Sequence, residues 1–177
     1  DVDGCHGLTG VYSRRKLARL APGTPAEIGP DLDIDVEVPL DYDDFLASFD
    51  EKLGAATAPP QLFFETSRGC WWGERAHCTF CGLNGVSMQY RAMRPEKALP
   101  YMQALLDRYG ARVREYQSID NIMPREYLRE VFPHLRPPEG VSLFYEVKAD
   151  LKDHELEVLA RAGVTQLQPG IEALATA

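Results

Sequence analysis

The sequence predicts an α/β fold built from about four successive βα units, preceded by an irregular acidic segment. From residue 61 onward, short apolar runs typical of strands alternate with amphipathic patterns typical of helices, and Gly or Pro stands at their ends. Each strand and helix together occupy roughly 30 residues, a length typical of parallel strands joined by right-handed crossovers. Four such units make half of a (β/α)₈ barrel or an open parallel sheet.

The first unit is expected to begin with a strand at residues 61–66, whose Leu-Phe-Phe core predicts burial. The helix that follows should end at Gly110, and its inward positions have helical spacing: Ala98, Tyr101, Met102, Leu105, Leu106 and Tyr109. Pro100 lies within this pattern. We therefore expect it to bend the helix or to delay its start.

Three further strands are expected at residues 113–119, 141–147 and 164–168. A helix between the first two of these should begin near Arg125 and be stopped by Pro133 and Pro137. The last helix has Asp153 as its expected N-cap and Gly163 after its end. Its positions expected to face inward are Leu156, Leu159 and Ala160.

The N-terminal third differs from the rest of the chain. Residues 1–58 show no clear periodicity and are expected to be a linker, with residues 59–177 as the folded core. Residues 31–51 contain nine acidic side chains and no Lys or Arg, but they lack the alternation and the Gly of a calcium loop. A solvated acidic face is favoured over a calcium site. One short helix is expected to dock on the core through Tyr42, Phe45, Leu46 and Phe49.

The bulk composition narrows the class of protein. A net charge of −8 argues against a nucleic-acid partner, because phosphate binding needs clustered Lys and Arg. No apolar run is long enough for a membrane span and no charged leader opens the chain, so we expect no membrane partner and a cytoplasmic location. The chain begins with Asp1 and ends soon after its last strand, so we expect a fragment of a longer protein.

Three of the four cysteines, Cys70, Cys78 and Cys81, lie within twelve residues, directly after the first expected strand. This spacing suits a metal site better than a disulfide framework, and thiolates prefer zinc, copper(I) or iron–sulfur clusters. Structural zinc normally takes four protein ligands, and His77 is the available fourth. His77 is adjacent to Cys78, and adjacent residues are poorly placed to share one ion. A Cys₃His zinc site is therefore the less favoured alternative.

Three cysteine ligands would leave one iron of a [4Fe-4S] cluster open for a substrate or cofactor, whereas electron carriers usually close the cluster with four cysteines. The position also fits, because parallel α/β folds place their sites at the carboxyl edge of the sheet. Phe80, directly before Cys81, could shield the cluster or pack within the loop. Cys5 is remote and is not expected to be a ligand.

The cysteine loop, ETSRGCWWGE at residues 65–74 and HCTFCGLNG at residues 77–85, resembles that of the radical S-adenosylmethionine (SAM) superfamily. The spacing of seven and then two residues is similar to that of the ribosomal-peptide (RiPP) maturation members, often described as cobalamin-dependent C-methyltransferases. The resemblance covers residues 30–177. It continues at the ends of the later strands, in Asp120-Asn121-Ile122 and in residues 144–149 and 168–172.

This resemblance implies that residues 59–177 are the N-terminal part of a radical SAM partial (β/α) barrel, and that residues 1–58 are a linker and remnant following an absent cobalamin-binding domain. The implied cofactors are a [4Fe-4S] cluster on the three cysteines, SAM, and cobalamin held by that other domain. By position, Asp120 would meet the SAM amino group and Glu172 its ribose. Glu146 and Lys148 share one face of their strand, where they could bind substrate or pair with each other.

The implied activity is cleavage of SAM to a 5′-deoxyadenosyl radical, which takes a hydrogen atom from a ribosomally made precursor peptide. In the methyltransferase version, methylcobalamin then supplies a methyl group, and no side chain need act as acid or base. Epimerisation or crosslinking of a peptide would use the same cofactors, and the sequence leaves open whether this chain alone is active. The implied partners are the precursor peptide and an electron donor such as flavodoxin or ferredoxin. The rival from another class is a zinc-binding module.

Overall fold

The computed structural model describes residues 2–25, 33–36, 38–54, 59–82 and 89–171, and residue contacts divide the chain into two units, residues 1–33 and 34–177. The first unit contains a 3₁₀ helix, η1 (Val2–Gly7), and a short helix, α1 (Arg14–Leu17). Ser13 caps α1, because its Oγ accepts a hydrogen bond from the Lys16 amide at 3.0 Å. The expected domain boundary at residue 58, with a linker before it and the folded core after it, stays a prediction.

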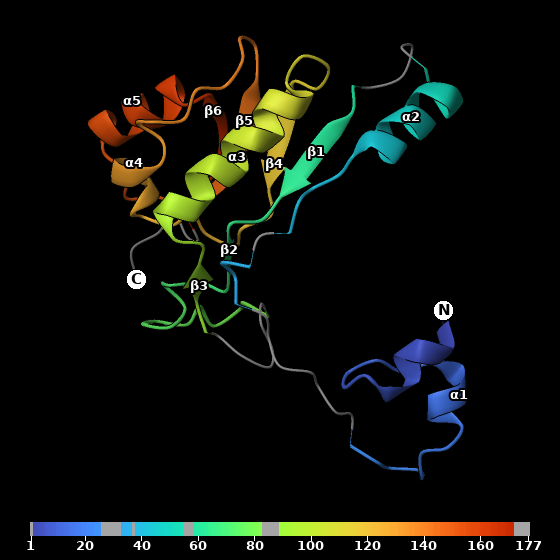
Figure 1. Cartoon of the computed structure of the whole chain (residues 1–177). Coiled ribbons are helices and arrows are strands. Elements are labelled where there is room, and N and C mark those ends of the chain that lie inside the picture. Colours follow the sequence, from blue (N-terminus) through green and yellow to red (C-terminus); the bar gives the residue numbers. More distant parts are fainter. Residues whose placement is uncertain (1, 26–32, 37, 55–58, 83–88, 172–177) are drawn as a thin grey trace. The chain divides into compact units, whose positions relative to one another are not determined.

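A four-stranded parallel sheet forms the centre of the second unit. Its strands lie side by side in chain order: β1 (Gln61–Phe64), β4 (Glu115–Ser118), β5 (Ser142–Lys148) and β6 (Val164–Gly170) (Figure 1). Each neighbouring pair is parallel, with Gln61 opposite Glu115 and Tyr116 opposite Leu143. Parallel strands in chain order are the arrangement of half a (β/α) barrel. The predicted fold class is therefore confirmed.

One face of the sheet packs on helices, and no described helix covers the other. Much of the core comes from helices α3 (Pro95–Tyr109), α4 (Tyr127–Glu130) and α5 (Asp153–Arg161) (Figure 1). Side chains alternate accordingly, so Leu62 and Phe64 are buried whereas Phe63 is 42% exposed. The expectation of a buried first strand is therefore wrong for Phe63, because the described helices cover a single face.

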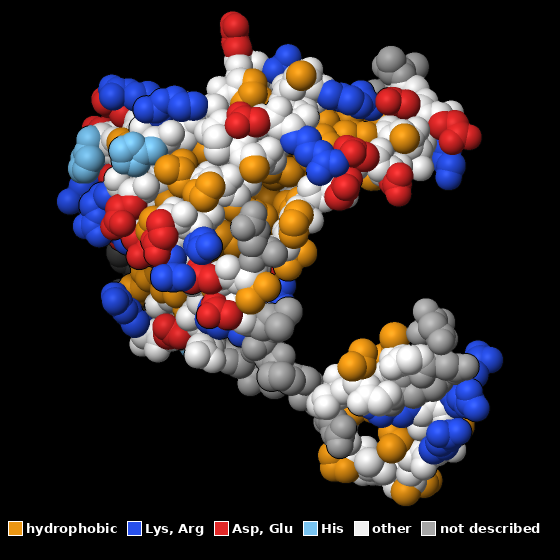
Figure 2. All heavy atoms as spheres, viewed as in Figure 1, with side chains coloured by type: hydrophobic (Ala, Val, Ile, Leu, Met, Phe, Trp, Pro, Cys, Tyr) orange, Lys and Arg blue, Asp and Glu red, His pale blue; other side chains and the backbone are white. Residues whose placement is uncertain are grey.

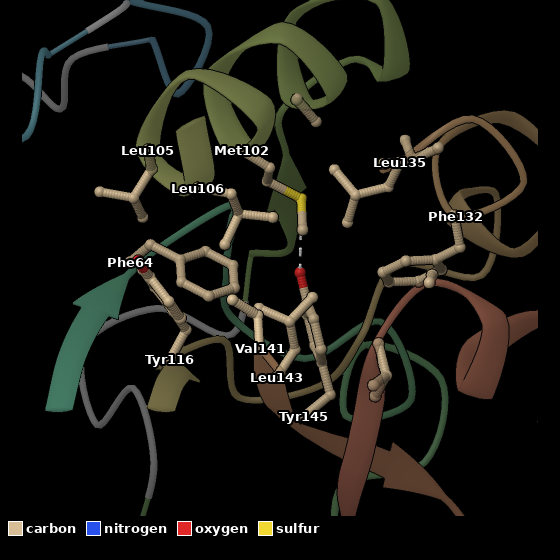
Figure 3. Packing of buried hydrophobic residues seen from close by; sticks show 14 of the residues in the cluster. Phe64, Met102, Leu105, Leu106, Tyr116, Phe132, Leu135, Val141, Leu143 and Tyr145 are labelled. Atoms are coloured by element: carbon tan, nitrogen blue, oxygen red, sulfur yellow. Dashed lines mark hydrogen bonds between the residues drawn. The ribbon is translucent and has the colours of Figure 1, made fainter. Parts of the chain in front are cut away.

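The core is centred on Tyr145 of β5. Its ring contacts Phe64 and Phe132 edge to face, at centroid distances of 5.8 and 5.5 Å (Figure 3). Its hydroxyl donates a hydrogen bond to the Met102 sulfur at 3.7 Å, drawn as a dashed line in Figure 3. Burial raises the Tyr145 pKa well above its ordinary value. These contacts hold β1, β5, α3 and the segment after α4 together.

α3 has the predicted inward face, with Tyr101 half-buried and the other five positions buried. The expectation of a delayed start is wrong, since the helix begins at Pro95, a position where the missing N–H is not needed. Pro100 lies in the second turn on the exposed side, so its ring does not disturb the packing on the sheet. Neither this helix of 15 residues nor any other in the described part of the chain is long and apolar enough to cross a membrane.

Two details of α5 differ from the prediction. Lys152 is the N-cap and Asp153 is the first helical residue, so the cap lies one position earlier than expected. Of the three positions expected to face inward, Leu159 is buried, whereas Leu156 is 41% exposed and Ala160 is exposed. This helix touches the sheet along a narrow stripe centred on Leu159, and the residues beside the stripe meet solvent.

The short helix predicted near residues 42–49 is confirmed as α2 (Asp43–Lys52), with Leu46 buried in the core. The Tyr42 ring packs edge to face on Tyr109 of α3 at a centroid distance of 5.9 Å. The Tyr42 amide also donates a hydrogen bond to the Tyr109 hydroxyl at 2.8 Å. An aromatic contact and a hydrogen bond therefore dock the start of α2 on α3.

The acidic side chains around α2 pair with arginines. An Arg108 nitrogen lies 3.2 Å from an Asp41 oxygen and 2.5 Å from an Asp43 oxygen, and Arg112 pairs with Asp50. Figure 2 shows acidic and basic side chains interspersed in this region. Within the residues that the structure describes, no three His, Cys, Asp or Glu side chains form a group that could hold a metal ion. The acidic stretch thus forms an ion-paired surface.

Replacing Leu143 with Ala is expected to lower the free energy of unfolding by about 2–5 kcal/mol, because the side chain is fully buried in β5 and leaves a cavity. Leu156→Ala is the matched control and should cost less than about 1 kcal/mol, since Leu156 is 41% exposed. Urea unfolding followed by circular dichroism measures both variants. Equal losses would contradict the packing described for β5 and α5.

Candidate metal centre at the carboxyl edge of the sheet

The cysteine loop begins where β1 leaves the sheet. The chain there enters β2 (Ser67–Arg68), which pairs in antiparallel fashion with β3 (Arg91–Ala92). This two-stranded ladder joins the two ends of the segment 69–90 beyond the carboxyl end of β1 (Figure 1). The cysteines therefore lie on a loop that is closed at its base and located at the edge where parallel α/β folds place their sites.

The base of the loop is tight at Gly69. This residue has a φ of +86°, and a Cβ built on it would lie 2.3 Å from the Gln89 carbonyl oxygen. The next residue, Tyr90, donates its amide hydrogen to a Glu74 carboxylate oxygen at 2.6 Å. These contacts tie the far end of the loop to its first turn.

Cys70 lies on a hydrogen-bonded turn directly after this base. Its carbonyl accepts a hydrogen bond from the Glu74 amide at 3.1 Å, and the Gly73 amide donates to its Sγ at 3.3 Å. Hydrogen bonds from amides to sulfur are a feature of the surroundings of iron–sulfur clusters. The other two cysteines form a second turn, in which the Cys81 amide donates to the Cys78 carbonyl at 3.0 Å. All three thiols are free and partly exposed.

The three thiols are not gathered at one point. No metal-holding group of three His, Cys, Asp or Glu side chains occurs in the described part of the chain, which includes all three cysteines. The donor set does fit a cluster, because it consists of soft thiols on one loop with an amide already directed at the first sulfur. That Cys70, Cys78 and Cys81 ligate one group stays a prediction.

The Tyr90 hydroxyl is a second feature that fits a polar ligand. It is buried and makes no hydrogen bond within the described residues. Burial raises the Tyr90 pKa, and the nearby Asp120 and Cys70 raise it further. The nearby Ser67 hydroxyl offsets part of this rise, although its geometry to the Tyr90 hydroxyl is not that of a hydrogen bond. A protonated hydroxyl therefore lies near Cys70, where it can donate to a sulfur or to a bound molecule.

Other predicted site residues lie apart from these thiols or outside the described residues. Phe80 is 71% exposed, and its role beside a cluster stays a prediction. His77 is also exposed and, like the three cysteines, belongs to no metal-holding group in the described segments, so the zinc alternative stays a prediction too. Glu172 lies outside the described residues, and its expected contact with the SAM ribose stays a prediction.

Asp120 follows two residues after β4 and is 1% exposed. Its Oδ1 accepts hydrogen bonds from the Thr66 amide at 2.6 Å and the Ser67 amide at 2.9 Å, and its Oδ2 accepts from the Thr66 hydroxyl at 2.5 Å. Burial raises the Asp120 pKa to about 6, and these hydrogen bonds offset part of the rise. The carboxylate thus faces the start of the cysteine loop, and its expected contact with SAM stays a prediction.

A pocket of about 440 Å³ opens between the first turn of the loop and the carboxyl ends of β4 and β5. It is lined by Trp71, Trp72, Arg75, Tyr90, Pro124, Arg125, Glu126, Lys148 and Asp150. The Lys148 ammonium lies 3.6 Å from the Trp72 ring centroid. The Arg125 guanidinium lies 5.4 Å from the Trp71 centroid and pairs with Asp150. Two aromatic faces and both signs of charge suit a ligand that carries a ring and opposite charges.

This pocket was not found from the sequence. The alternative in which Lys148 pairs with Glu146 on the same face of β5 is not what the structure shows, because the Lys148 ammonium lies over Trp72. Glu146 forms no ion pair with a described residue, and partial burial raises its pKa. The signal that could have revealed the pocket is the pair of adjacent tryptophans directly after the first cysteine of the loop.

The chain is similar in fold to solved structures of the cobalamin-dependent S-adenosylmethionine radical enzyme OxsB. OxsB with aqua-cobalamin bound matches with a TM-score of 0.57 and 19% identity, over 83% of this chain and 22% of that chain. OxsB with aqua-cobalamin and SAM bound matches with a TM-score of 0.54 and 17% identity, over 81% and 21%. This chain thus spans less than a quarter of the solved chains, and at this identity the likeness shows the fold. No family model and no curated protein match the sequence.

Gly69→Ala is expected to destabilise the chain by about 1–3 kcal/mol and to speed alkylation of Cys70, because the new Cβ would meet the Gln89 carbonyl at a positive φ. Gly82→Ala is the matched control in the same loop and should change stability by less than about 0.5 kcal/mol, since its Cβ would have no described atom within 4 Å. Urea unfolding and mass-spectrometric mapping of iodoacetamide labelling measure the two effects. If Gly69→Ala behaved like the control, the tight base would be contradicted.

Proposed function

We propose that the chain is part of a radical SAM enzyme, in which Cys70, Cys78 and Cys81 ligate a [4Fe-4S] cluster and SAM binds beside it. The observation that carries the proposal is the position of the cysteine loop. The loop is closed by β2 and β3 at the carboxyl edge of the parallel sheet, in a chain whose fold is similar to part of OxsB. Three thiolate ligands would leave one iron available to SAM.

Such a cluster supplies, when bound, the electron for reductive cleavage of SAM. The residues of the chain hold and protect the reactants. The Gly73 amide donates a hydrogen bond to the Cys70 sulfur at 3.3 Å, and the Tyr90 hydroxyl is available as a further donor. Cys78 and Cys81 would have to close on Cys70, which the exposed residues 74–77 between them permit.

The same proposal assigns the pocket beside Trp71 and Trp72 to SAM. An adenine ring can stack on an indole, and the methionine carboxylate can pair with Lys148 or with Arg75, which has no ion-pair partner among the described residues. Glu126 offers a carboxylate for the amino group. The volume of about 440 Å³ lies in the usual range of small-molecule sites.

The finer parts of the proposed function rest on the sequence resemblance. The substrate would be a ribosomally made precursor peptide and the reaction a C-methylation, with epimerisation or crosslinking as the alternative radical outcomes. Cobalamin dependence is supported by the cobalamin bound in the OxsB structures. An electron donor such as flavodoxin or ferredoxin would reduce the cluster, and a reducing cytoplasm would keep the three thiols free.

After anaerobic reconstitution with iron and sulfide, the full chain is expected to hold about four iron and four sulfide ions. Cys70→Ala, Cys78→Ala and Cys81→Ala should each lose most of the iron, because two thiolates cannot hold the cluster. Cys5→Ala is the matched control and should retain it, since Cys5 belongs to the other unit. Metal analysis by mass spectrometry and a sulfide assay provide the measurement.

Zinc content separates this proposal from the zinc-binding alternative. His77→Ala should keep its iron, because His77 is exposed and is not among the proposed ligands. Bound zinc without iron in the anaerobic protein, or loss of the metal in His77→Ala, would overturn the cluster and favour a Cys₃His module.

Trp72→Ala and Lys148→Gln are each expected to weaken SAM binding about tenfold, since one stacking or charged contact is worth roughly 1–2 kcal/mol. Equilibrium dialysis of labelled SAM against anaerobically reconstituted protein gives the affinity. Trp72→Phe should lose less because it keeps an aromatic face, and Lys152→Gln, an exposed lysine at the start of α5, should bind like the wild type. Unchanged affinity in both pocket variants would remove SAM from this pocket.

A further inference from the structure

We infer that Asp120 is a positioning residue: it is a latch that holds the start of the cysteine loop against the end of β4 and does not touch bound SAM. Both carboxylate oxygens already accept hydrogen bonds, Oδ1 from the Thr66 and Ser67 amides and Oδ2 from the Thr66 hydroxyl. With 1% of the residue exposed, a ligand atom would reach the carboxylate only after the loop had opened.

The latch continues the connection between β1 and β4 beyond the end of their parallel pairing. The last backbone hydrogen bond of this pairing is donated by the Ile119 amide to the Phe64 carbonyl at 2.9 Å. The Thr66 and Ser67 amides follow at once, in residues that are 0% exposed, and a buried N–H without an acceptor is costly. Asp120 supplies that acceptor and so directs the chain from the sheet into β2.

The same two residues are held from their other side. The Thr66 carbonyl accepts a hydrogen bond from the Met93 amide at 2.7 Å, directly after β3. The Ser67 hydroxyl donates to the Ile122 carbonyl at 3.2 Å. Cys70 lies three residues further along the chain, so the position of its sulfur depends on this anchored segment.

The surroundings of Asp120 determine how the latch responds to pH. The titratable groups that face it are the tyrosine hydroxyls of the loop, α3, α4 and β5: Tyr90, Tyr101, Tyr127 and Tyr145. Asp120 forms no ion pair with any described residue. Burial raises its pKa from 3.8 to about 6, so the closed latch binds a proton more tightly than an opened, hydrated one. The latch is therefore strongest below pH 4 and weakens as the pH rises through 6.

Amide hydrogen exchange of the full chain without added iron tests the latch. In the wild type, protection of the Thr66 and Ser67 amides should fall about tenfold between pH 5 and pH 7.5, after correction for intrinsic rates. Asp120→Asn should keep the protection but lose its pH dependence, because the side-chain oxygen can accept both amides and the NH₂ group can donate to the Thr66 hydroxyl. Asp120→Ala should lose the protection at both pH values and raise Cys70 alkylation by iodoacetamide about tenfold.

Two further variants keep the test decisive. Thr66→Val removes one of the three hydrogen bonds while keeping the shape of the side chain, and should give an intermediate loss even if Asp120→Ala does not fold. Asp107→Ala, an exposed carboxylate on α3, should leave the loop unchanged. If residues 66–67 kept wild-type protection in both Asp120→Ala and Thr66→Val, the inference would be overturned. An equal loss of protection in β5 would overturn it too, because that result would indicate general destabilisation.

The consequence for metal binding rests on the proposed function. Iron content after reconstitution distinguishes a failure of the latch from a failure of the proposed function. If the wild type and Asp120→Asn bind iron and Asp120→Ala binds several-fold less, the latch positions the cysteines for the cluster. If Asp120→Ala binds as much iron as the wild type, that positioning role is overturned. If the wild type takes up no iron, the proposed function fails, whereas the exchange experiment still decides whether the latch exists.

Discussion

Parallel pairing of β1 with β4 is the constraint on which the rest of the second unit depends. Because the two strands run in the same direction, their carboxyl ends meet at one edge of the sheet, with Phe64 opposite Ser118. The segments that leave these ends must then pass close to each other, since each turns away from the sheet at the same place. Asp120 holds the two segments together there by accepting hydrogen bonds from two amides that lie beyond the last hydrogen bond of the sheet.

The loop and the pocket both follow from this arrangement. The small ladder of β2 and β3 returns the loop to its own start, so the cysteine segment is held at both ends while its middle residues stay exposed. Its first turn places two indole rings beside the carboxyl ends of the next two strands, where Arg125 and Lys148 meet them. Helices on one face of the sheet fix the strands, and the pocket lies at their carboxyl edge.

The distribution of charge separates this edge from the rest of the unit. The chain carries a net charge of −8, and much of the acidic excess near α2 is paired with Arg108 and Arg112 on the surface. The pocket instead contains three cations and two carboxylates. A ligand with a carboxylate would therefore find a local excess of positive charge on a protein that is acidic as a whole.

The sequence by itself determined the order of the four parallel strands and of helices α2 to α5, the inward face of α3 and the single loop that carries Cys70, Cys78 and Cys81. Hydrophobic periodicity and cysteine spacing are local properties, so they can be read without knowing the fold. Only the tertiary structure decided that Phe63 and Leu156 meet solvent, that Lys148 lies over Trp72, and that the Asp120 carboxylate faces Thr66. Each of these depends on which distant segment packs against a residue, and the spacing of residues along the chain does not show which segment that is.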